Sequence, residues 1–207
     1  VKPEPNFNLL DRFLIMMGQQ GLKCVICFNK QDLASPEEKE RLRFTYEGSG
    51  CRLLFTSAGE REGMVELSNL LAGKTTAVAG PSGVGKSSLI NCLNPSAGMQ
   101  TGDISRKIQR GRHTTRHSEL IALQENTYIM DTPGFTSLGL FFLEKEELQG
   151  FYPEFAAYEK NCRFRGCVHL NEPDCGVKEA LREGKISQVR YGNYQALYQE
   201  LRDRRKY

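Results

Sequence analysis

A glycine-rich segment, Gly80–Ser87, has the spacing of a loop that binds phosphate. Its letters G-P-S-G-V-G-K-S fit the pattern G-x-x-x-x-G-K-[ST], with an apolar strand expected before it and a helix after it. The glycines let the backbone curl so that several N–H groups face phosphate oxygens, and the dipole of the following helix favours the same charge. Lys86 is placed to reach the β- and γ-phosphates, and the Ser87 hydroxyl to bind Mg²⁺. The segment predicts a nucleoside triphosphate site; the alternative is a glycine turn with an exposed lysine.

The motif N-K-x-D, formed by Asn29, Lys30 and Asp32, indicates which base is bound. A carboxylate at Asp32 can accept hydrogen bonds from N1–H and the exocyclic amine of guanine, whereas adenine presents the opposite polarity there. We expect Asn29 to hold N7 and neighbouring backbone, and the stem of Lys30 to lie over the face of the ring. The predicted ligand is therefore GTP.

Two more motifs agree with GTP. The sequence T-S-A, containing Ser57 and Ala58, ends the next expected strand, where GTPases place a backbone N–H on guanine O6. The sequence D-T-P-G, from Asp131 to Gly134, has the form of the loop that senses the γ-phosphate. In ordinary GTPases the phosphate loop comes first and N-K-x-D last, whereas here N-K-x-D comes first. The order predicts a circularly permuted GTPase whose motifs meet at one sheet edge, with the γ-phosphate loop leading directly into the C-terminal domain.

The segment 104–118 is the expected first switch. It carries five arginines or lysines and two histidines without an acid. Either Thr114 or Thr115 would bind Mg²⁺, and the sequence does not choose between them. Because Phe135 and Thr136 follow Gly134, the glutamine that orients water in many small GTPases is missing, and His113 is the candidate for that role. The alternatives are a solvated loop histidine and, for the basic residues, either contact with RNA phosphates or a solvated loop.

A second group of residues has the spacing of a metal site. Cys162-x4-Cys167-x-His169-x5-Cys175 places three thiols and one imidazole within 14 residues. Three cysteines and one histidine form a closed tetrahedral zinc site, so the predicted role is structural. A disulfide would leave one cysteine over.

Helices and strands must position these residues, and the hydrophobic pattern of the sequence predicts where those elements lie. We expect strands over Val25–Phe28, Arg52–Phe55, Thr75–Ala79, Glu119–Leu123 and Thr127–Met130, and helices over Leu9–Met17, Met64–Leu71 and Ser87–Leu93, with another capped by Ser35. The alternation favours an α/β sheet with helices on both faces. Beyond about residue 140 only helical patterns appear, so we place a GTPase domain at 1–140 and a helical zinc-knuckle domain at 141–207.

The last helix of that second domain has a clear apolar face. Its members recur at spacings of three and four: Ile186, Val189, Tyr194, Leu197, Tyr198 and Leu201. The basic residues after it, Arg202, Arg204, Arg205 and Lys206, either stabilise the helix dipole or bind phosphate.

The composition excludes several other classes of protein. The chain has 207 residues, 39% hydrophobic and 26% charged, so it is neither disordered nor a membrane protein. Seven cysteines are too few for a disulfide scaffold, and no apolar run approaches the roughly 18 residues that a membrane span needs. A net charge of +3 does not by itself argue for nucleic acid. We expect a cytoplasmic protein.

The order of these motifs resembles the RsgA (YjeQ/YloQ) family of circularly permuted bacterial GTPases that act late in assembly of the small ribosomal subunit. The resemblance implies zinc at the four residues above, stimulation of hydrolysis by the subunit, and the switch histidine at His113. From the motifs and the basic residues we also expect Mg²⁺ with GTP and contact with the rRNA of the subunit. It implies these GTP contacts: Asn29, Lys30, Asp32, Gly80, Pro81, Ser82, Gly83, Val84, Gly85, Lys86, Ser87 and Ser88. The two further motifs add Ser57, Ala58, Asp131 and Gly134 as expected contacts.

One family feature is missing from this sequence. Family members carry an N-terminal OB-fold barrel, and this chain begins too late to contain it. We expect a monomer. The alternative functions are a nucleotide-dependent RNA-binding module, or a permuted ribosome-assembly GTPase with another client.

Overall fold

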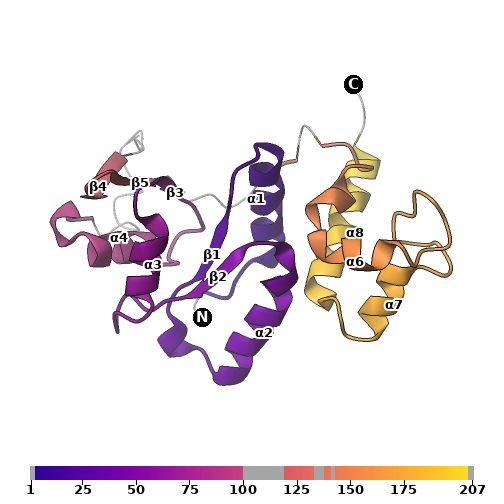
Figure 1. The fold of residues 1–207 in the computed structure, drawn as a ribbon, viewed down its shortest axis with the longest axis horizontal. Coiled ribbons are helices and arrows are strands. Elements are labelled where there is room, and N and C mark those ends of the chain that lie inside the picture. Colours follow the sequence, from indigo (N-terminus) through magenta and orange to yellow (C-terminus); the bar gives the residue numbers. More distant parts are fainter. Residues whose placement is uncertain (1–2, 100–118, 133–137, 141–142, 205–207) are drawn as a thin grey trace, which may run out of the picture. The chain divides into compact units, whose positions relative to one another are not determined.

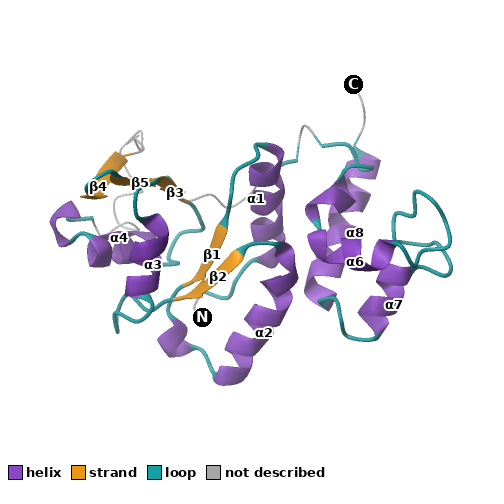
Figure 2. Cartoon of the chain, viewed as in Figure 1, coloured by secondary structure: helices purple, strands orange, loops and turns teal. Residues whose placement is uncertain are grey.

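The computed structural model describes residues 3–99, 119–132, 138–140 and 143–204 (Figure 1). Strands occur only in the first part of the described chain, and helices form the C-terminal part (Figure 2). The strands are β1 (Val25–Phe28), β2 (Arg52–Phe55), β3 (Thr75–Val78), β4 (Glu119–Gln124) and β5 (Thr127–Asp131). The helices are α1 (Phe7–Gln19), α2 (Pro36–Tyr46), α3 (Met64–Leu71), α4 (Lys86–Leu93), α6 (Ala156–Glu159), α7 (Gly176–Arg182) and α8 (Gln188–Asp203).

The chain divides into two compact units that are not continuous in sequence. The first contains Val1–Pro5, Cys27–Ala34 and Leu54–Ser137, and so holds the N-K-x-D motif and the phosphate loop. The second contains Asn6–Ile26, Ser35–Leu53 and Leu138–Tyr207. Helices α1 and α2 therefore belong to the same compact unit as the C-terminal helices.

The first unit is built on a three-stranded sheet of order β3-β5-β4. Strand β3 pairs with β5 in parallel, from Thr75 opposite Tyr128 to Val78 opposite Asp131, and β4 pairs with β5 as an antiparallel hairpin. Helices α3 and α4 pack on this sheet through a core that contains Leu71, Ile90, Ile121 and Ile129. The parallel register places the end of β5 beside the start of the phosphate loop, as the γ-phosphate motif requires.

Strands β1 and β2 form a separate two-stranded sheet among the described residues. The amide of Thr56 donates to the carbonyl of Phe28, so the carboxyl ends of the two strands lie side by side. The Phe28 and Phe55 rings are 5.3 Å apart between centroids. Where the sequence predicts a single sheet, the described residues form two sheets. Side-chain hydrogen bonds, and not strand pairing, connect the ends of β1 and β2 with the phosphate loop.

Helix α2, which connects β1 to β2, begins as its sequence predicts. The Ser35 hydroxyl accepts from the backbone amide of Glu38, and the Glu38 carboxylate accepts from the amide of Ser35. This reciprocal pair satisfies two amides that a helix start would otherwise leave without partners. The predicted cap is confirmed.

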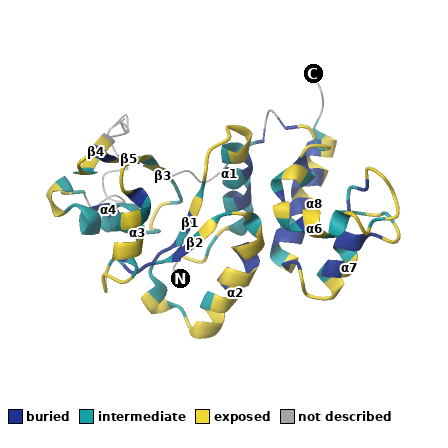
Figure 3. Cartoon of the chain, in the orientation of Figure 1, coloured by how far each residue is buried: buried dark blue, intermediate teal, exposed yellow. Residues whose placement is uncertain are grey.

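The second unit has an aromatic core around α8. The rings of Tyr152, Phe155, Tyr191 and Tyr194 pack together, with Phe155 and Tyr194 meeting edge to face at 5.1 Å between centroids. The predicted face of α8 is buried at Tyr194, Leu197, Tyr198 and Leu201, and Ile186 just before the helix is buried too. Val189 is only partly buried, because the helix turns Arg190 and Tyr191 inward instead. Figure 3 shows that α8 carries both buried and exposed residues.

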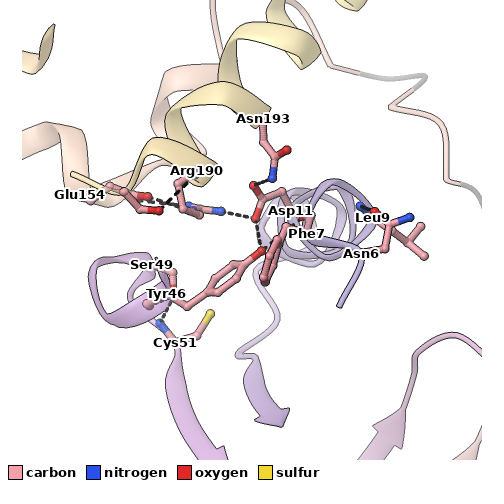
Figure 4. A network of polar contacts seen from close by, with 11 residues as sticks. Asn6, Phe7, Leu9, Asp11, Tyr46, Ser49, Cys51, Glu154, Arg190 and Asn193 are labelled. Atoms are coloured by element: carbon pink, nitrogen blue, oxygen red, sulfur yellow. Dashed lines mark hydrogen bonds and ion pairs between the residues drawn. The ribbon is translucent and has the colours of Figure 1, made fainter. Parts of the chain in front are cut away.

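Arg190 is the centre of a buried polar network inside the second unit (Figure 4). Its side chain is 2% exposed and lies 2.5 Å from Asp11 of α1, which is fully buried, and 2.7 Å from Glu154. Asp11 also accepts hydrogen bonds from the hydroxyl of Tyr46 on α2 and the amide of Asn193 on α8. Because each charge has a partner of opposite sign and several hydrogen bonds, its burial is tolerated, and the network fastens α8 to α1 and α2.

Candidate functional site

The phosphate loop runs from the end of β3 to the start of α4, as the sequence predicts. Gly85 is the residue before the helix and has φ 96°, a backbone conformation that residues other than glycine rarely adopt. A Cβ at Gly85 would lie 2.3 Å from the amide nitrogen of Asn29. This glycine is therefore required twice, by the backbone conformation and by the close approach of the N-K-x-D motif.

Lys86 folds back over this loop. Its ammonium donates to the carbonyl oxygens of Gly80, at 2.7 Å, and Pro81, at 3.0 Å. The charge is thereby held at the mouth of a loop whose amides are followed by a helix N-terminus. Such an arrangement attracts phosphate oxygens.

The N-K-x-D motif is joined to the phosphate loop by its first two side chains. The Asn29 amide donates to the carbonyl of Val84 at 3.0 Å, and the Lys30 ammonium donates to the carbonyl of Gly83 at 2.8 Å. These contacts span more than 50 residues of sequence. Two motifs that the sequence presents in reversed order thus form one site.

Asn29 also connects this site to the T-S-A turn. Its side chain is buried, and its oxygen accepts from the Thr56 hydroxyl at 3.2 Å and the amide of Ala58 at 3.3 Å. The amide of Ser57 donates to the carbonyl of Glu62. The expected contacts of Asn29 with N7, and of this turn with guanine O6, remain predictions.

Asp32 follows on a short 3-10 turn, Gln31–Leu33, which Lys30 begins in a left-handed conformation. The Asp32 side chain is exposed, in contrast to the buried Asn29. A solvent-facing carboxylate at this position is accessible to the edge of a base. Asn29 and Lys30 therefore connect this loop to the phosphate loop, whereas the Asp32 side chain faces solvent.

Asp131 ends β5 directly opposite Val78, the last residue of β3. The hydroxyl of Thr132 donates to the carbonyl of Val78 at 2.7 Å, which ties the D-T-P-G motif to the strand before the phosphate loop. One carboxylate oxygen of Asp131 is buried without a hydrogen-bond partner among the described residues. A buried carboxylate oxygen in that state fits a role toward a hydrated cation.

Several predicted site residues lie outside the described part of the chain. They are His113, Thr114, Thr115 and Gly134. The basic residues of segment 104–118 lie outside it as well. Their assigned roles stay predictions.

The cysteine and histidine group converges as its spacing predicts. The ligand atoms of Cys162, Cys167, His169 and Cys175 all lie within 4.8 Å of one another and could hold a metal ion. Burial raises the pKa of Cys167 to about 12 and lowers the pKa of His169. A buried thiol of this kind ionises only beside a cation, whereas a neutral imidazole is ready to bind one.

The loop that carries His169 is fixed from both sides. The two oxygens of Glu172 accept from the amides of Val168 and Leu170, at 2.8 and 2.9 Å. From α8, the hydroxyls of Tyr191 and Tyr194 donate to the carbonyls of His169 and Val168. His169 itself has φ 60°, so these bonds hold a backbone conformation that few residues adopt unaided.

Gly176, next to the ligand Cys175, is required by packing. A Cβ there would lie 2.3 Å from the carbonyl oxygen of Tyr158. The turn after the last ligand therefore closes against α6 only because residue 176 has no side chain.

Sequence reasoning missed the charged residues that support these sites. Asp11, Glu154 and Arg190 belong to no motif, and the one signal for Arg190 is a charge between two apolar residues on a helix. Glu172 lies within the cysteine spacing but has no recognised place in it. Their partners are fixed by tertiary contacts, which no local pattern contains.

Comparison with known proteins gives consistent matches over the whole chain. The sequence model of the family described as RsgA GTPase matches residues 1–141. A relative from Agathobacter rectalis named "Small ribosomal subunit biogenesis GTPase RsgA" is 61% identical over 206 residues, which is 100% of this chain and 68% of the relative. A relative of the same name from Alkaliphilus metalliredigens is 47% identical, over 100% of this chain and 70% of its own length.

Two solved structures resemble the fold. YjeQ from Thermotoga maritima superposes with a TM-score of 0.79 at 37% identity, covering 98% of this chain and 68% of that one. YloQ, described as a circularly permuted GTPase, superposes with a TM-score of 0.75 at 34% identity, covering 100% of this chain and 67% of that one.

Proposed function

Because this chain belongs to the RsgA GTPase family, we propose that it hydrolyses GTP to GDP and phosphate in late maturation of the small ribosomal subunit. Its fold is that of a circularly permuted GTPase. The observation that carries the proposal is the pair of hydrogen bonds from Asn29 and Lys30 to the carbonyls of Val84 and Gly83. They assemble a base-recognition loop and a phosphate loop into one nucleotide site.

The phosphates would bind at the loop Gly80–Ser88. Backbone amides at the start of α4 and the ammonium of Lys86 supply positive charge where the β- and γ-phosphates lie. Bound Mg²⁺ would neutralise charge that develops on the phosphates during transfer. The residues that would hold it are Ser87, Asp131 through water, and either Thr114 or Thr115.

Guanine would be selected by Asp32. Its exposed carboxylate can accept from both N1–H and the exocyclic amine. Adenine would leave that carboxylate without donors, at the cost of an unpaired charge in the complex. Asn29 and Lys30 would serve mainly to hold this loop against the phosphate loop.

His113 would position the attacking water, since the glutamine used by many small GTPases is missing after Gly134. We expect hydrolysis by the chain alone to be slow for the same reason, and stimulated by the small ribosomal subunit. A His113→Ala variant that binds GTP normally and keeps its full stimulated rate would contradict this role.

The metal of the cysteine group would be zinc. Zn–S bonds of about 2.3 Å and Zn–N bonds of about 2.0–2.1 Å in a tetrahedron separate two sulfurs by about 3.8 Å and a sulfur and a nitrogen by about 3.6 Å. The Sγ atoms of Cys162 and Cys175 are 3.8 Å apart, and Nδ1 of His169 lies 3.6 and 3.4 Å from them. With four protein ligands and no open position, zinc would stabilise the fold.

We assign the GTPase domain to residues 1–140 and the zinc domain to 141–207. The end of the family match at residue 141 supports this boundary. The proposed domains differ from the compact units, in which α1 and α2 belong with the C-terminal helices.

The proposed partners are the small ribosomal subunit and its rRNA, and the proposed state and location are a monomer in the cytoplasm. None of the helices in the described part of the chain is long and apolar enough to cross a membrane. Of the basic tail, Arg204 donates to the carbonyls of Leu140 and Leu143, and Arg202 pairs with Asp203. Arg205 and Lys206 lie outside the described residues, and their contact with phosphate stays a proposal.

The test is GTP hydrolysis by this chain with and without purified small ribosomal subunits. Lys86→Ala is the matched control, because it removes the phosphate-facing charge and leaves the base motif unchanged. Strong stimulation that Lys86→Ala abolishes is the expected result. Tight GTP binding without any hydrolysis, with or without subunits, would instead favour a nucleotide-dependent RNA-binding module.

A further inference from the structure

His169 presents one particular nitrogen to the thiols. Its side chain is 2% exposed, and Nδ1 lies 3.6 Å from Sγ of Cys162 and 3.4 Å from Sγ of Cys175. Nδ1 is therefore the nitrogen that would bind the metal. The other nitrogen, Nε2, points away from the group.

Nε2 of His169 has an unmet requirement. A neutral imidazole that binds metal through Nδ1 must carry its hydrogen on Nε2. Nε2 is buried and has no hydrogen-bond partner among the described residues. A buried donor without an acceptor is costly, so an acceptor should lie nearby.

Two glutamates lie near Nε2 of His169, and the oxygens of one of them already accept other hydrogen bonds. Glu172 uses both of its oxygens on the amides of Val168 and Leu170. Glu159, at the end of α6, places Oε1 3.6 Å from Nε2 of His169, just beyond hydrogen-bond distance. Its side chain is 39% exposed, so it has room for the small movement that would close the contact.

We propose that Glu159 is a positioning residue for the metal site, accepting the Nε2 hydrogen of His169 and so directing the lone pair of Nδ1 toward the thiolates. The backbone bonds from Tyr191 and Glu172 fix where the loop lies, but they determine neither the tautomer nor the rotation of the ring. The ring of Phe155, which meets the imidazole edge to face at 5.7 Å between centroids, limits its rotation, and the carboxylate of Glu159 would select the tautomer. Carboxylates behind ligating histidines typically raise metal affinity 10- to 100-fold.

This inference rests on the proposed zinc site, and the test separates the two. Zinc affinity of the full chain would be measured at one pH by competition with a chromophoric chelator, for wild type, Glu159→Ala, Glu159→Gln and Glu179→Ala. Glu179 is the matched control: it is an exposed glutamate of α7 that pairs with Arg182. Nitrogen-15 NMR of labelled histidine in the zinc-loaded chain, which has three histidines, would report which nitrogen carries the hydrogen.

We expect Glu159→Ala to bind zinc about 10-fold or more weakly, Glu179→Ala to bind as wild type, and Glu159→Gln to fall between them, since an amide oxygen still accepts. In wild type the hydrogen should lie on Nε2 of His169. Equal affinity of Glu159→Ala and wild type, or a metal on Nε2, would overturn the role of Glu159 alone. A wild-type chain that takes up no zinc would overturn the zinc assignment and this role together.

Discussion

Replacing Arg190 by methionine should be among the most damaging single changes in this chain. Methionine keeps much of the apolar stem but removes the charge that pairs with Asp11 and Glu154. The Arg190 and Asp11 side chains are 2% and 0% exposed, so water cannot screen the loss. Removing one partner of such a buried pair costs about 3–5 kcal/mol. We expect the free energy of unfolding to fall by that amount at neutral pH.

The cost should depend on pH, with a defined sign. Burial raises the pKa of Asp11 above its ordinary value of 3.8, and the attraction of Arg190 opposes that rise. Without Arg190 the folded-state pKa rises further, so the variant gains relative stability wherever Asp11 is protonated in the fold. The destabilisation should be largest at high pH and shrink as the pH falls toward 3.8.

The assay is urea unfolding of the zinc-loaded chain at several pH values, with Arg182→Met as the control. Arg182 pairs with Glu179 at the surface, with side chains 69% and 55% exposed, so its loss should cost no more than about 0.5 kcal/mol. The double variant Asp11→Asn/Arg190→Met should recover about 1 kcal/mol or more relative to Arg190→Met. A cost below about 1 kcal/mol, or one that does not change with pH, would refute the reasoning.

Three further predictions concern the two sites. Asp32→Asn should weaken GTP binding and allow xanthosine triphosphate to bind, because the amide offers a donor where the carboxylate offered only acceptors. Competition binding checks this, and undiminished GTP affinity would contradict it. Gly85→Ala should abolish GTP binding, since the new Cβ meets Asn29 at 2.3 Å and φ is 96°. Titration with a fluorescent GTP analogue checks this, with Gly150→Ala, whose new Cβ meets nothing within 4 Å, as the control. Chelation of zinc should lower the melting temperature by several degrees, because the four ligand atoms lose the metal that joins them. Calorimetry before chelation, after it and after zinc is restored checks this. An unchanged transition would contradict a structural metal.

Sequence patterns located the elements that bear the motifs very well. The expected strands Val25–Phe28 and Arg52–Phe55 and the helix Met64–Leu71 are confirmed with the same bounds. These elements are short apolar runs bounded by turn residues or glycine, so local chemistry determines where they stop. The convergence of N-K-x-D with the phosphate loop was also predictable, because each motif is typical of one part of a GTP site.

The supporting charges were not predictable from the sequence. A charged residue beside the apolar face of a helix can lie either at its solvated edge or in a buried ion pair. Only the position of its partner distinguishes the two. For Asp11 the partner lies 179 residues away. The same limit applies to Glu159, whose relation to His169 depends on how α6 meets the cysteine loop.

The separation of Asp11 and Arg190 also governs how the protein is made. At about 5–20 residues per second, α8 is synthesised on the order of 10–40 s after α1. During that interval the nascent chain can pair β1 with β2 and α1 with Tyr46, yet Asp11 still lacks its cation. Helix α1 is thus made long before α8 and yet is among the last elements of this unit to reach its final environment. Translation through α8 sets the moment at which the second unit becomes stable, so nascent chains stalled before α8 should be the protease-sensitive ones.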